Sequence, residues 1–303
     1  MIKAYLLHLS FNMWADREVP EWDLEHISVR PYLRVDTSLW NDVLDRMVTE
    51  GLNTVVIDLG DGIRYRSHPE IAVQGAWSPT RLRAELARIR AIGLEPIPKL
   101  NFSACHDAWL GPYARCVSTP TYYDVCRALI AEVCELFDQP RFFHLGMDEE
   151  TAEHQRYYEY VVVRQCDLWW HDLGLLIESV EAAGVRPWIW SDYLWHHPDE
   201  FSRRMPKSVL QSNWYYGAEF GPHIPYAMAY LDLEAQGYDQ IPTGSNWTDD
   251  RNIAETVASA RKHISSERLV GFLQTVWQPT LEVCRARHMQ ALELAGQAFS
   301  EID

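Results

Sequence analysis

The sequence has little positive charge, no glycine-rich phosphate motif and no export signal. Its 27 lysines and arginines stand against 43 aspartates and glutamates, which gives a net charge of -16. A surface of this sign repels the phosphates of nucleic acids and of anionic lipids. We therefore expect neither a nucleic acid nor a membrane as partner, and a neutral or cationic ligand instead.

Three further absences narrow the class of protein. The G-D-G stretch at residues 60–62 lacks the remaining glycine and the helix of a dinucleotide-binding loop, so we expect no cofactor. The first eleven residues contain neither a cleavage site nor a membrane span, and they are typical of a strand. The six cysteines form no C-x-x-C pair and are expected as reduced thiols. We expect a cytoplasmic protein, and nothing in the sequence indicates its oligomeric state.

Tryptophan, in contrast, is abundant. The chain has 13 tryptophans in 303 residues, well above ordinary usage. An indole has a flat apolar face and a polar edge, and proteins stack it on sugar rings and cations. The apolar share of 47% is ordinary for a globular protein and supports a sizeable core. We expect one domain spanning residues 1–303.

Strand-like and helix-like segments alternate along the whole chain. The expected helices cover residues 37–50, 79–92, 121–137, 164–183, 225–236, 250–263 and 280–299, with Thr37 or Ser38 and Asp250 as caps of two of them. The expected strands cover residues 2–9, 53–58, 94–101, 141–145, 186–192, 209–216, 238–247 and 269–277. Eight strands that alternate with helices, without a linker, predict an α/β fold, a single (β/α)8 TIM barrel.

Polar and aromatic residues gather where these strands end. In a TIM barrel the carboxyl ends of all strands surround one mouth, and active sites lie there. The residues at or just after the ends are Asp58, Asn101, His106, Asp148, Glu149, Trp190, Asp192, Trp214, Tyr215, Trp247, Asp249 and Trp277. We predict that these side chains share a single site.

The stretch R-F-F-H-L-G-M-D-E-E at residues 141–150 runs from an apolar strand directly into three acids. Neighbouring side chains on a strand point to opposite faces, so Asp148 and Glu149 can serve one pocket only if the strand breaks there. A carboxylic acid among indole faces is suited to cleave a glycosidic bond, because it can protonate the leaving oxygen. Aromatic walls and a neighbouring aspartate favour the protonated form of Glu149. The alternative is a solvated acidic turn.

Several segments resemble those of glycoside hydrolase family 20, the β-N-acetylhexosaminidases. F-H-L-G-M-D-E is similar to the family's fourth-strand motif His-x-Gly-Gly-Asp-Glu, with Met147 at the second glycine. P-K-L-N-F-S-A-C-H resembles its third-strand segment, so that His106 matches the family's histidine and Asn101 stands where an acid is usual. W-I-W-S-D and V-L-Q-S-N-W resemble its fifth-strand Trp-Asp segment and its sixth-strand tryptophan.

The resemblance implies a function for the two acids. In the family the glutamate is the general acid and base, and the aspartate holds the 2-acetamido group whose carbonyl oxygen attacks the anomeric carbon. Carried over, Glu149 is the proton donor and Asp148 orients the acetamido group in a substrate-assisted retaining mechanism on a carbohydrate. The resemblance implies neither a protein nucleophile nor a metal.

The chain departs from the family at three sugar-binding positions. The family's Tyr-x-Asp segment reads W-T-D here, with Trp247 and Asp249, so that Tyr215 or Tyr216 is the alternative source of the tyrosine. The last-strand Trp-x-Glu reads W-Q-P, with Gln278 following Trp277. The first-strand arginine has no clear counterpart, although Arg17 could reach inward. These departures predict a divergent branch.

Two other classes of function stay open. A metal-dependent barrel hydrolase or sugar isomerase would need a cluster of histidines at the mouth, and His8 stands alone on the first strand. A sugar-binding barrel without catalysis is the other, and the presence of both Asp148 and Glu149 argues against it.

Overall fold

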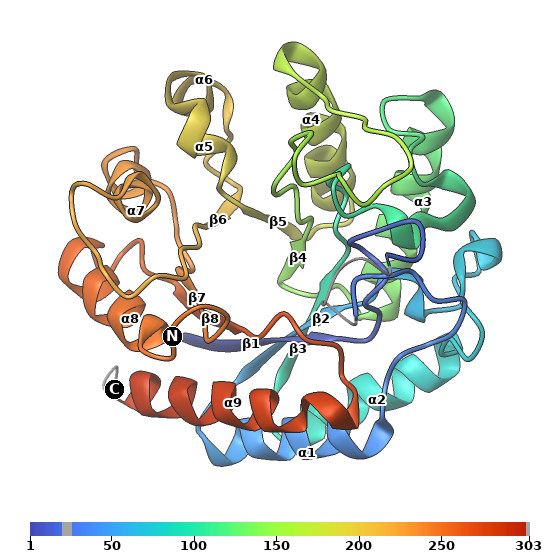
Figure 1. Cartoon of the computed structure of the whole chain (residues 1–303), viewed down its shortest axis with the longest axis horizontal. Coiled ribbons are helices and arrows are strands. Elements are labelled where there is room, and N and C mark those ends of the chain that lie inside the picture. The colour runs from blue at the N-terminus through green and yellow to red at the C-terminus, as the bar shows by residue number, and fades with distance from the viewer. Residues whose placement is uncertain (20–25, 301–303) are drawn as a thin grey trace.

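Eight parallel strands form one sheet at the centre of the molecule, in the order β6-β5-β4-β3-β2-β1-β8-β7 (Figure 1). The structure, a computed structural model, describes residues 1–19 and 26–300. The strands are β1 (Ile2–His8), β2 (Thr54–Asp58), β3 (Glu95–Lys99), β4 (Phe142–His144), β5 (Arg186–Trp190), β6 (Leu210–Ser212), β7 (Thr243–Ser245) and β8 (Gly271–Thr275). Between the two end strands, Thr243 N donates to Asn213 O over 3.0 Å. The sheet is thus a nearly closed barrel, which confirms the predicted TIM fold.

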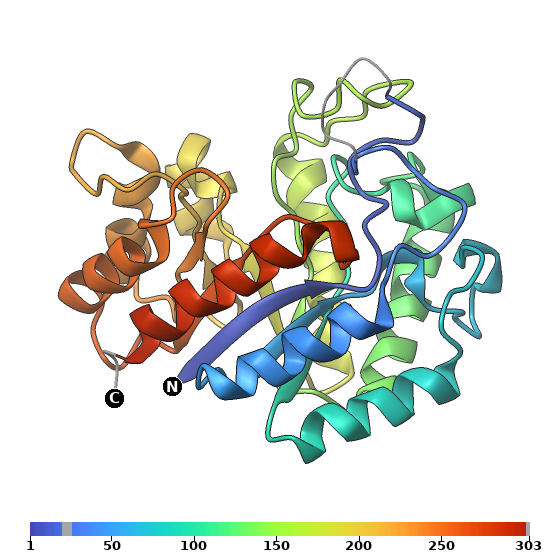
Figure 2. The same ribbon diagram turned by 60° about the horizontal axis from the view of Figure 1, so that its bottom comes forward.

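Helices surround this barrel (Figure 2). They are α1 (Thr37–Thr49), α2 (Pro79–Ala91), α3 (Pro120–Leu136), α4 (Cys166–Ala182), α5 (Tyr193–His196), α6 (Pro198–Arg204), α7 (Pro225–Ala235), α8 (Asn252–His263) and α9 (Arg285–Ser300). The sequence did not predict α5 and α6, because helices this short have too few turns to show a hydrophobic period. Among the described residues, no helix has both the length and the apolar character that crossing a membrane requires.

Two predicted helix caps and one predicted helix start were wrong. The first helix begins at Thr37, and the capping position is Asp36, whose side chain makes no capping bond. The eighth begins after Arg251, so Asp250 does not cap it. The last begins at Arg285 rather than at 280, after a short 3-10 turn. Helix ends depend on local contacts that composition does not reveal.

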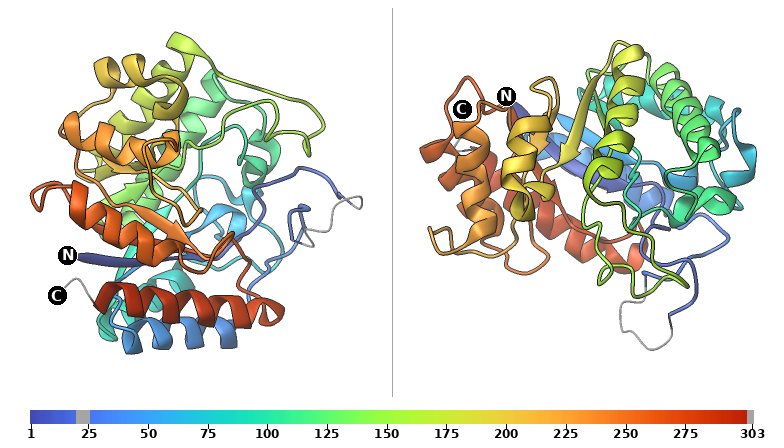
Figure 3. Two further views of the ribbon diagram at one scale, coloured as in Figure 1. Left: turned by 60° about the vertical axis from the view of Figure 1, so that its left-hand side comes forward. Right: turned by 90° about the horizontal axis from the view of Figure 1, so that it is seen from above.

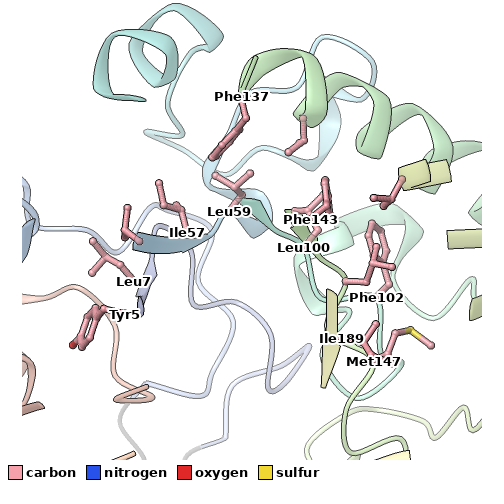
Figure 4. Close-up of a cluster of buried hydrophobic side chains, with 14 of the residues drawn as sticks. Tyr5, Leu7, Ile57, Leu59, Leu100, Phe102, Phe137, Phe143, Met147 and Ile189 are labelled. Atoms are coloured by element: carbon pink, nitrogen blue, oxygen red, sulfur yellow. The ribbon is translucent and has the colours of Figure 1, made fainter. Parts of the chain in front are cut away.

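Successive side chains of a strand point to opposite faces of the sheet, so each strand packs both outward and into the barrel. On the outer face, Leu7, Ile57, Phe143 and Ile189 lie in the core between barrel and helices (Figure 4). On the inner face, Trp188 and Trp190 both belong to the cluster that fills the barrel, and they are 0% and 1% exposed. An interior filled with side chains leaves the mouth as the place for a ligand.

Candidate active site

The backbone leaves the extended conformation just after β4. Gly146, Met147 and Glu149 have φ angles of 72°, 73° and 56°. These lie in the left-handed region, which residues other than glycine rarely adopt. This break brings neighbouring acids to one side, since His106 Nε2 lies 3.3 Å from Asp148 Oδ2 and 3.4 Å from Glu149 Oε2. The two carboxylates thus meet at a single imidazole, as they could not on a regular strand.

Asp148 is buried and held as an anion. Asn101 Nδ2 donates a hydrogen bond of 2.8 Å to its Oδ1. Lys99 lies fully buried nearby, where it pairs with Asp58. Burial alone would raise the pKa of Asp148, but the charges of His106 and Lys99 and the bond from Asn101 hold that pKa well below its usual range. The carboxylate therefore keeps its negative charge at any ordinary pH.

His106 acts on the acids rather than on the cavity. Its ring is 2% exposed, and the edge of the Trp14 indole packs against it at 4.8 Å. Burial would lower the pKa of His106, but Asp148 and Glu149 outweigh it and raise the pKa to about 10. A positive imidazolium thus joins the two carboxylates. Neither His106 nor Asn101, which the sequence predicts as sugar contacts, lines either of the two cavities beside the acids.

Glu149 is the more accessible of the two acids. Its side chain is 20% exposed, and its Oε1 lies 3.5 Å from His154 Nε2. Its backbone N–H donates to Asp192 Oδ2 over 2.8 Å. Burial and then the charge of Asp148 raise the pKa of Asp192 to about 8, so this carboxyl is largely protonated at neutral pH. Sequence reasoning missed His154, because it lies in a loop and not at a strand end.

The third acid of the cluster has a different task. Glu150 accepts hydrogen bonds of 2.6 Å from both Nε and Nη2 of Arg164, which is 1% exposed. The same arginine donates to Asp172 Oδ2 over 3.1 Å. Glu150 therefore anchors the loop between β4 and α4 and is not a candidate for the chemistry.

Aromatic side chains face the acids from β5, β6 and β8. The ring of Trp190, which is buried in the barrel interior, lies 6.1 Å from that of Trp277. Trp214 stacks on Tyr216 at 5.1 Å, and Trp277 Nε1 donates to Tyr216 Oη over 2.9 Å. Trp14, which the sequence did not single out, joins them at 5.9 Å from Trp277. The predicted tryptophans of three different strands thus meet in one place.

Two cavities open beside the acids, with volumes of about 1000 and 680 Å³. Both are lined by Glu149, His154, Trp214 and Tyr216. Asp148 lines only the smaller cavity. The loop between β4 and α4 lies beside the N-terminal loop (Figure 3), where Tyr158 Oη donates to Met13 O.

The remaining predicted residues divide between the site and the surface. Tyr215 lines the larger cavity, whereas Trp247 and Gln278 line the smaller one. Asp249 pairs with Arg251, its Oδ2 lying 2.8 Å from the guanidinium, and it lines neither cavity. Arg17 donates to the carbonyl of Glu18, and it also lies outside both cavities.

His106, Asp148 and Glu149 also form a candidate cation site, with ligand atoms within 4.8 Å of one another. A metal binds the neutral form of histidine. Because the two acids raise the pKa of His106 to about 10, the imidazole would have to lose its proton first. The arrangement fits an internal ion pair better than a metal.

The comparisons with known proteins bear on the fold. No family model matches the sequence, and no curated protein matches it. A β-N-acetylhexosaminidase from Bacteroides fragilis superposes with a TM-score of 0.67 at 14% identity, covering 98% of this chain and 65% of that one. A family 20 exo-β-N-acetylglucosaminidase from Vibrio harveyi gives 0.64 at 13%, covering 99% and 56%. A family 20 enzyme from Streptomyces coelicolor A3(2) gives 0.65 at 14%, covering 97% and 64%.

This chain therefore spans less than two thirds of each of these proteins. At such identities the likeness concerns the fold, and it agrees with the resemblance of the strand-end motifs. The chain is a divergent TIM-barrel protein with the fold of the glycoside hydrolase family 20 β-N-acetylhexosaminidases.

Proposed function

We propose that the protein is a glycoside hydrolase that acts on 2-acetamido sugars by a substrate-assisted, retaining mechanism. The observation that carries the proposal is the pair of adjacent acids, Asp148 and Glu149, which both lie within 3.4 Å of His106. One acid is buried and ionised, and the other faces both cavities. Two neighbouring acids with different environments suit two different tasks. The similar folds of several β-N-acetylhexosaminidases support this assignment.

In this mechanism the two acids act on different parts of the sugar. The Asp148 carboxylate accepts a hydrogen bond from the acetamido N–H, which orients the carbonyl oxygen toward the anomeric carbon. That oxygen forms a bond to the anomeric carbon while Glu149 gives its proton to the leaving oxygen, which keeps the electron pair of the broken bond. Glu149 then takes a proton from water as the water opens the oxazolinium ring. The sugar leaves with its original anomeric configuration.

Tyr216 is the better candidate for the family's acetamido-binding tyrosine. It lines the smaller cavity together with Asp148, whereas Tyr215 lines only the larger one. Burial first, and then the nearby charges of Glu149 and Asp148, raise the pKa of Tyr216 far above its usual value. Its hydroxyl group therefore stays protonated and can donate to the acetamido oxygen.

The test is the hydrolysis of nitrophenyl glycosides with and without a 2-acetamido group. We expect turnover of the acetamido sugars alone, and a loss of about 10²- to 10⁴-fold in kcat/KM for Glu149→Gln. Asp148→Asn should lose activity on the same substrates. Asp249→Asn is the matched control, because Asp249 pairs with Arg251 outside both cavities, and its rates should match those of the unmodified protein.

Cleavage of glycosides that lack the 2-acetamido group would show the proposal to be wrong. Absence of cleavage of every glycoside in the panel would do the same. The same assay tests the metal-dependent alternative. A chelator should leave the rate unchanged, whereas a loss that Zn²⁺ restores would assign His106, Asp148 and Glu149 to a metal site.

A further inference from the structure

The second step of the proposed mechanism needs a water molecule beside Glu149. This water attacks the anomeric carbon from the side that the leaving group has vacated, and Glu149 takes one of its protons. A water molecule that is held in place makes about three hydrogen bonds, so one carboxylate oxygen does not fix its position. A second side chain is required on the same side of the sugar. This inference rests on the proposed function of Glu149.

The two carboxylate oxygens of Glu149 face different histidines. Its Oε2 lies 3.4 Å from His106 Nε2, and its Oε1 lies 3.5 Å from His154 Nε2. His106 is 2% exposed and positively charged, so it stabilises negative charge on Oε2. The side chain of His154, in contrast, is 43% exposed. The proton therefore leaves from and returns to Oε1, the oxygen on the side of His154.

We propose that His154 positions the water molecule that opens the oxazolinium ring. The separation of 3.5 Å between Nε2 and Oε1 allows one water molecule to lie about 2.8 Å from both atoms. Glu149 and His154 each line both cavities, so water reaches this place once the leaving group has gone. The motif F-H-L-G-M-D-E ends at Glu149, and the family resemblance assigns no role to His154.

The step balances in electrons and protons. The water oxygen accepts a hydrogen bond from the Nε2–H group of His154 and donates one to Glu149 Oε1. This oxygen forms a bond to the anomeric carbon while the bond from that carbon to the acetamido oxygen breaks, and the acetamido oxygen keeps the electron pair. The proton passes to Oε1, which the first step left as a carboxylate oxygen. His154 gains and loses no proton.

The ring of His154 is already fixed by the turn that carries it. Thr151 Oγ1 lies 2.8 Å from Nδ1 and accepts a bond of 3.3 Å from the backbone N–H of His154. When the hydroxyl group donates to Nδ1, the ring hydrogen is on Nε2, where the water needs a donor. Gln155 is fully buried and donates to Thr151 O over 3.2 Å and to Val162 O over 2.7 Å. A donor held in this way needs little reorganisation during the reaction.

The experiment compares two substrates that require different steps. For 4-nitrophenyl N-acetyl-β-glucosaminide, kcat/KM includes only the steps up to the departure of nitrophenol. The 1,2-oxazoline of N-acetylglucosamine enters after that departure and needs only the attack of water. His154→Ala should lower kcat/KM for the oxazoline about fivefold, the effect of one neutral hydrogen bond. It should change kcat/KM for the nitrophenyl substrate less than twofold.

Two further variants serve as controls. In His154→Gln the side-chain amide can donate in place of Nε2, so most of the rate on the oxazoline should return. His68→Ala is the matched control, because His68 Nδ1 lies 3.0 Å from Glu70 Oε1 and both residues lie outside the two cavities. It removes a histidine from a glutamate without touching the site, and both rates should match those of the unmodified protein.

The outcomes separate this inference from the proposed function. Equal losses on both substrates in His154→Ala, or no loss on the oxazoline, would overturn the role of His154, while hydrolysis by the unmodified protein would still support the proposed function. A loss in His154→Gln as large as that in His154→Ala would also contradict a hydrogen-bond donor. If the unmodified protein hydrolyses neither compound, the proposed function is wrong and the role of His154 falls with it.

Discussion

The acids on one side of the mouth have protein partners, whereas two indole N–H groups on the other side have none among the described residues. The carboxylate side comes from the loops after β3 and β4 and comprises Asn101, His106, Asp148, Glu149, Glu150 and Arg164. The aromatic side comes from β5, β6 and β8 and comprises Trp190, Trp214, Tyr216 and Trp277. On the carboxylate side every acid has a charged or amide partner within 3.5 Å. On the aromatic side the Nε1 atoms of Trp190 and Trp214 have no partner among the described residues.

We infer from this difference that the carboxylate side prepares the reaction and that the aromatic side binds the ligand. Charges that must act in a transition state are most effective when they are already held in place. The hydrogen bond from Asn101 and the ion pairs with His106 hold the acids in place before any ligand arrives. An indole contributes most to the affinity for a sugar when its N–H group has no partner in the protein and can donate a hydrogen bond to the ligand. The comparison therefore predicts that variants on the carboxylate side lose stability and that variants on the aromatic side lose affinity.

The largest loss of stability is expected for Arg164→Met. The change removes the positive partner of two buried acids, Glu150 and Asp172, and leaves their charges inside the protein. Breaking a buried ion pair from one side costs about 3–5 kcal/mol. Urea unfolding, followed by circular dichroism, measures this cost.

Trp277→Phe is the control for Arg164→Met on the aromatic side. It removes the hydrogen bond of 2.9 Å to Tyr216 and should cost about 1 kcal/mol. Equal losses in the two variants would remove the distinction between the two sides.

The sequence predicted the barrel because the features that indicate this fold are local in the chain. Strand and helix periods repeat along the chain, and the residues that follow each strand end reach the common mouth without any knowledge of loop conformation. The break after β4 could also be foreseen, since Asp148 and Glu149 cannot otherwise share a pocket. These features depend on residues close together in the chain.

The direction of individual side chains depended on contacts that are distant in sequence. Asn101 and His106 support the acids from behind, whereas a strand-end position alone suggested contact with a sugar. The loop that carries His154 is held in part by Arg115, which donates a hydrogen bond of 2.7 Å to the neighbouring Gln155, forty residues later. No local pattern in the sequence indicates the bond from Arg115, so the position of this loop could not be predicted.

Asp192→Asn is expected to change how the stability of the protein depends on pH. In the folded protein, burial and the charge of Asp148 raise the pKa of Asp192 from 3.8 to about 8. The folded state therefore keeps a proton that the unfolded state releases between about pH 4 and pH 8, and stability falls as pH rises through this range. One group contributes at most about 1.4 kcal/mol per pH unit.

Asparagine removes this contribution and can still accept the bond from the Glu149 N–H. The difference in unfolding free energy between Asp192→Asn and the unmodified protein should grow from pH 5 to pH 8 in favour of the variant. Urea midpoints at four pH values measure it. Parallel profiles would mean that Asp192 ionises normally, and the side of the mouth around Glu149 would then be less enclosed than the structure indicates.

The smallest effect, and the most selective, is expected for Trp214→Phe. Phenylalanine keeps a ring that can stack on Tyr216 but removes the Nε1 atom that has no protein partner among the described residues. Loss of one neutral hydrogen bond to a ligand is worth about 1 kcal/mol, or roughly fivefold in affinity. Because no bond within the described protein is lost, the free energy of unfolding should change much less than in Trp277→Phe. A drop in stability without a change in affinity for the acetamido sugar would mean that this indole serves packing, and the aromatic side would then be as complete as the carboxylate side.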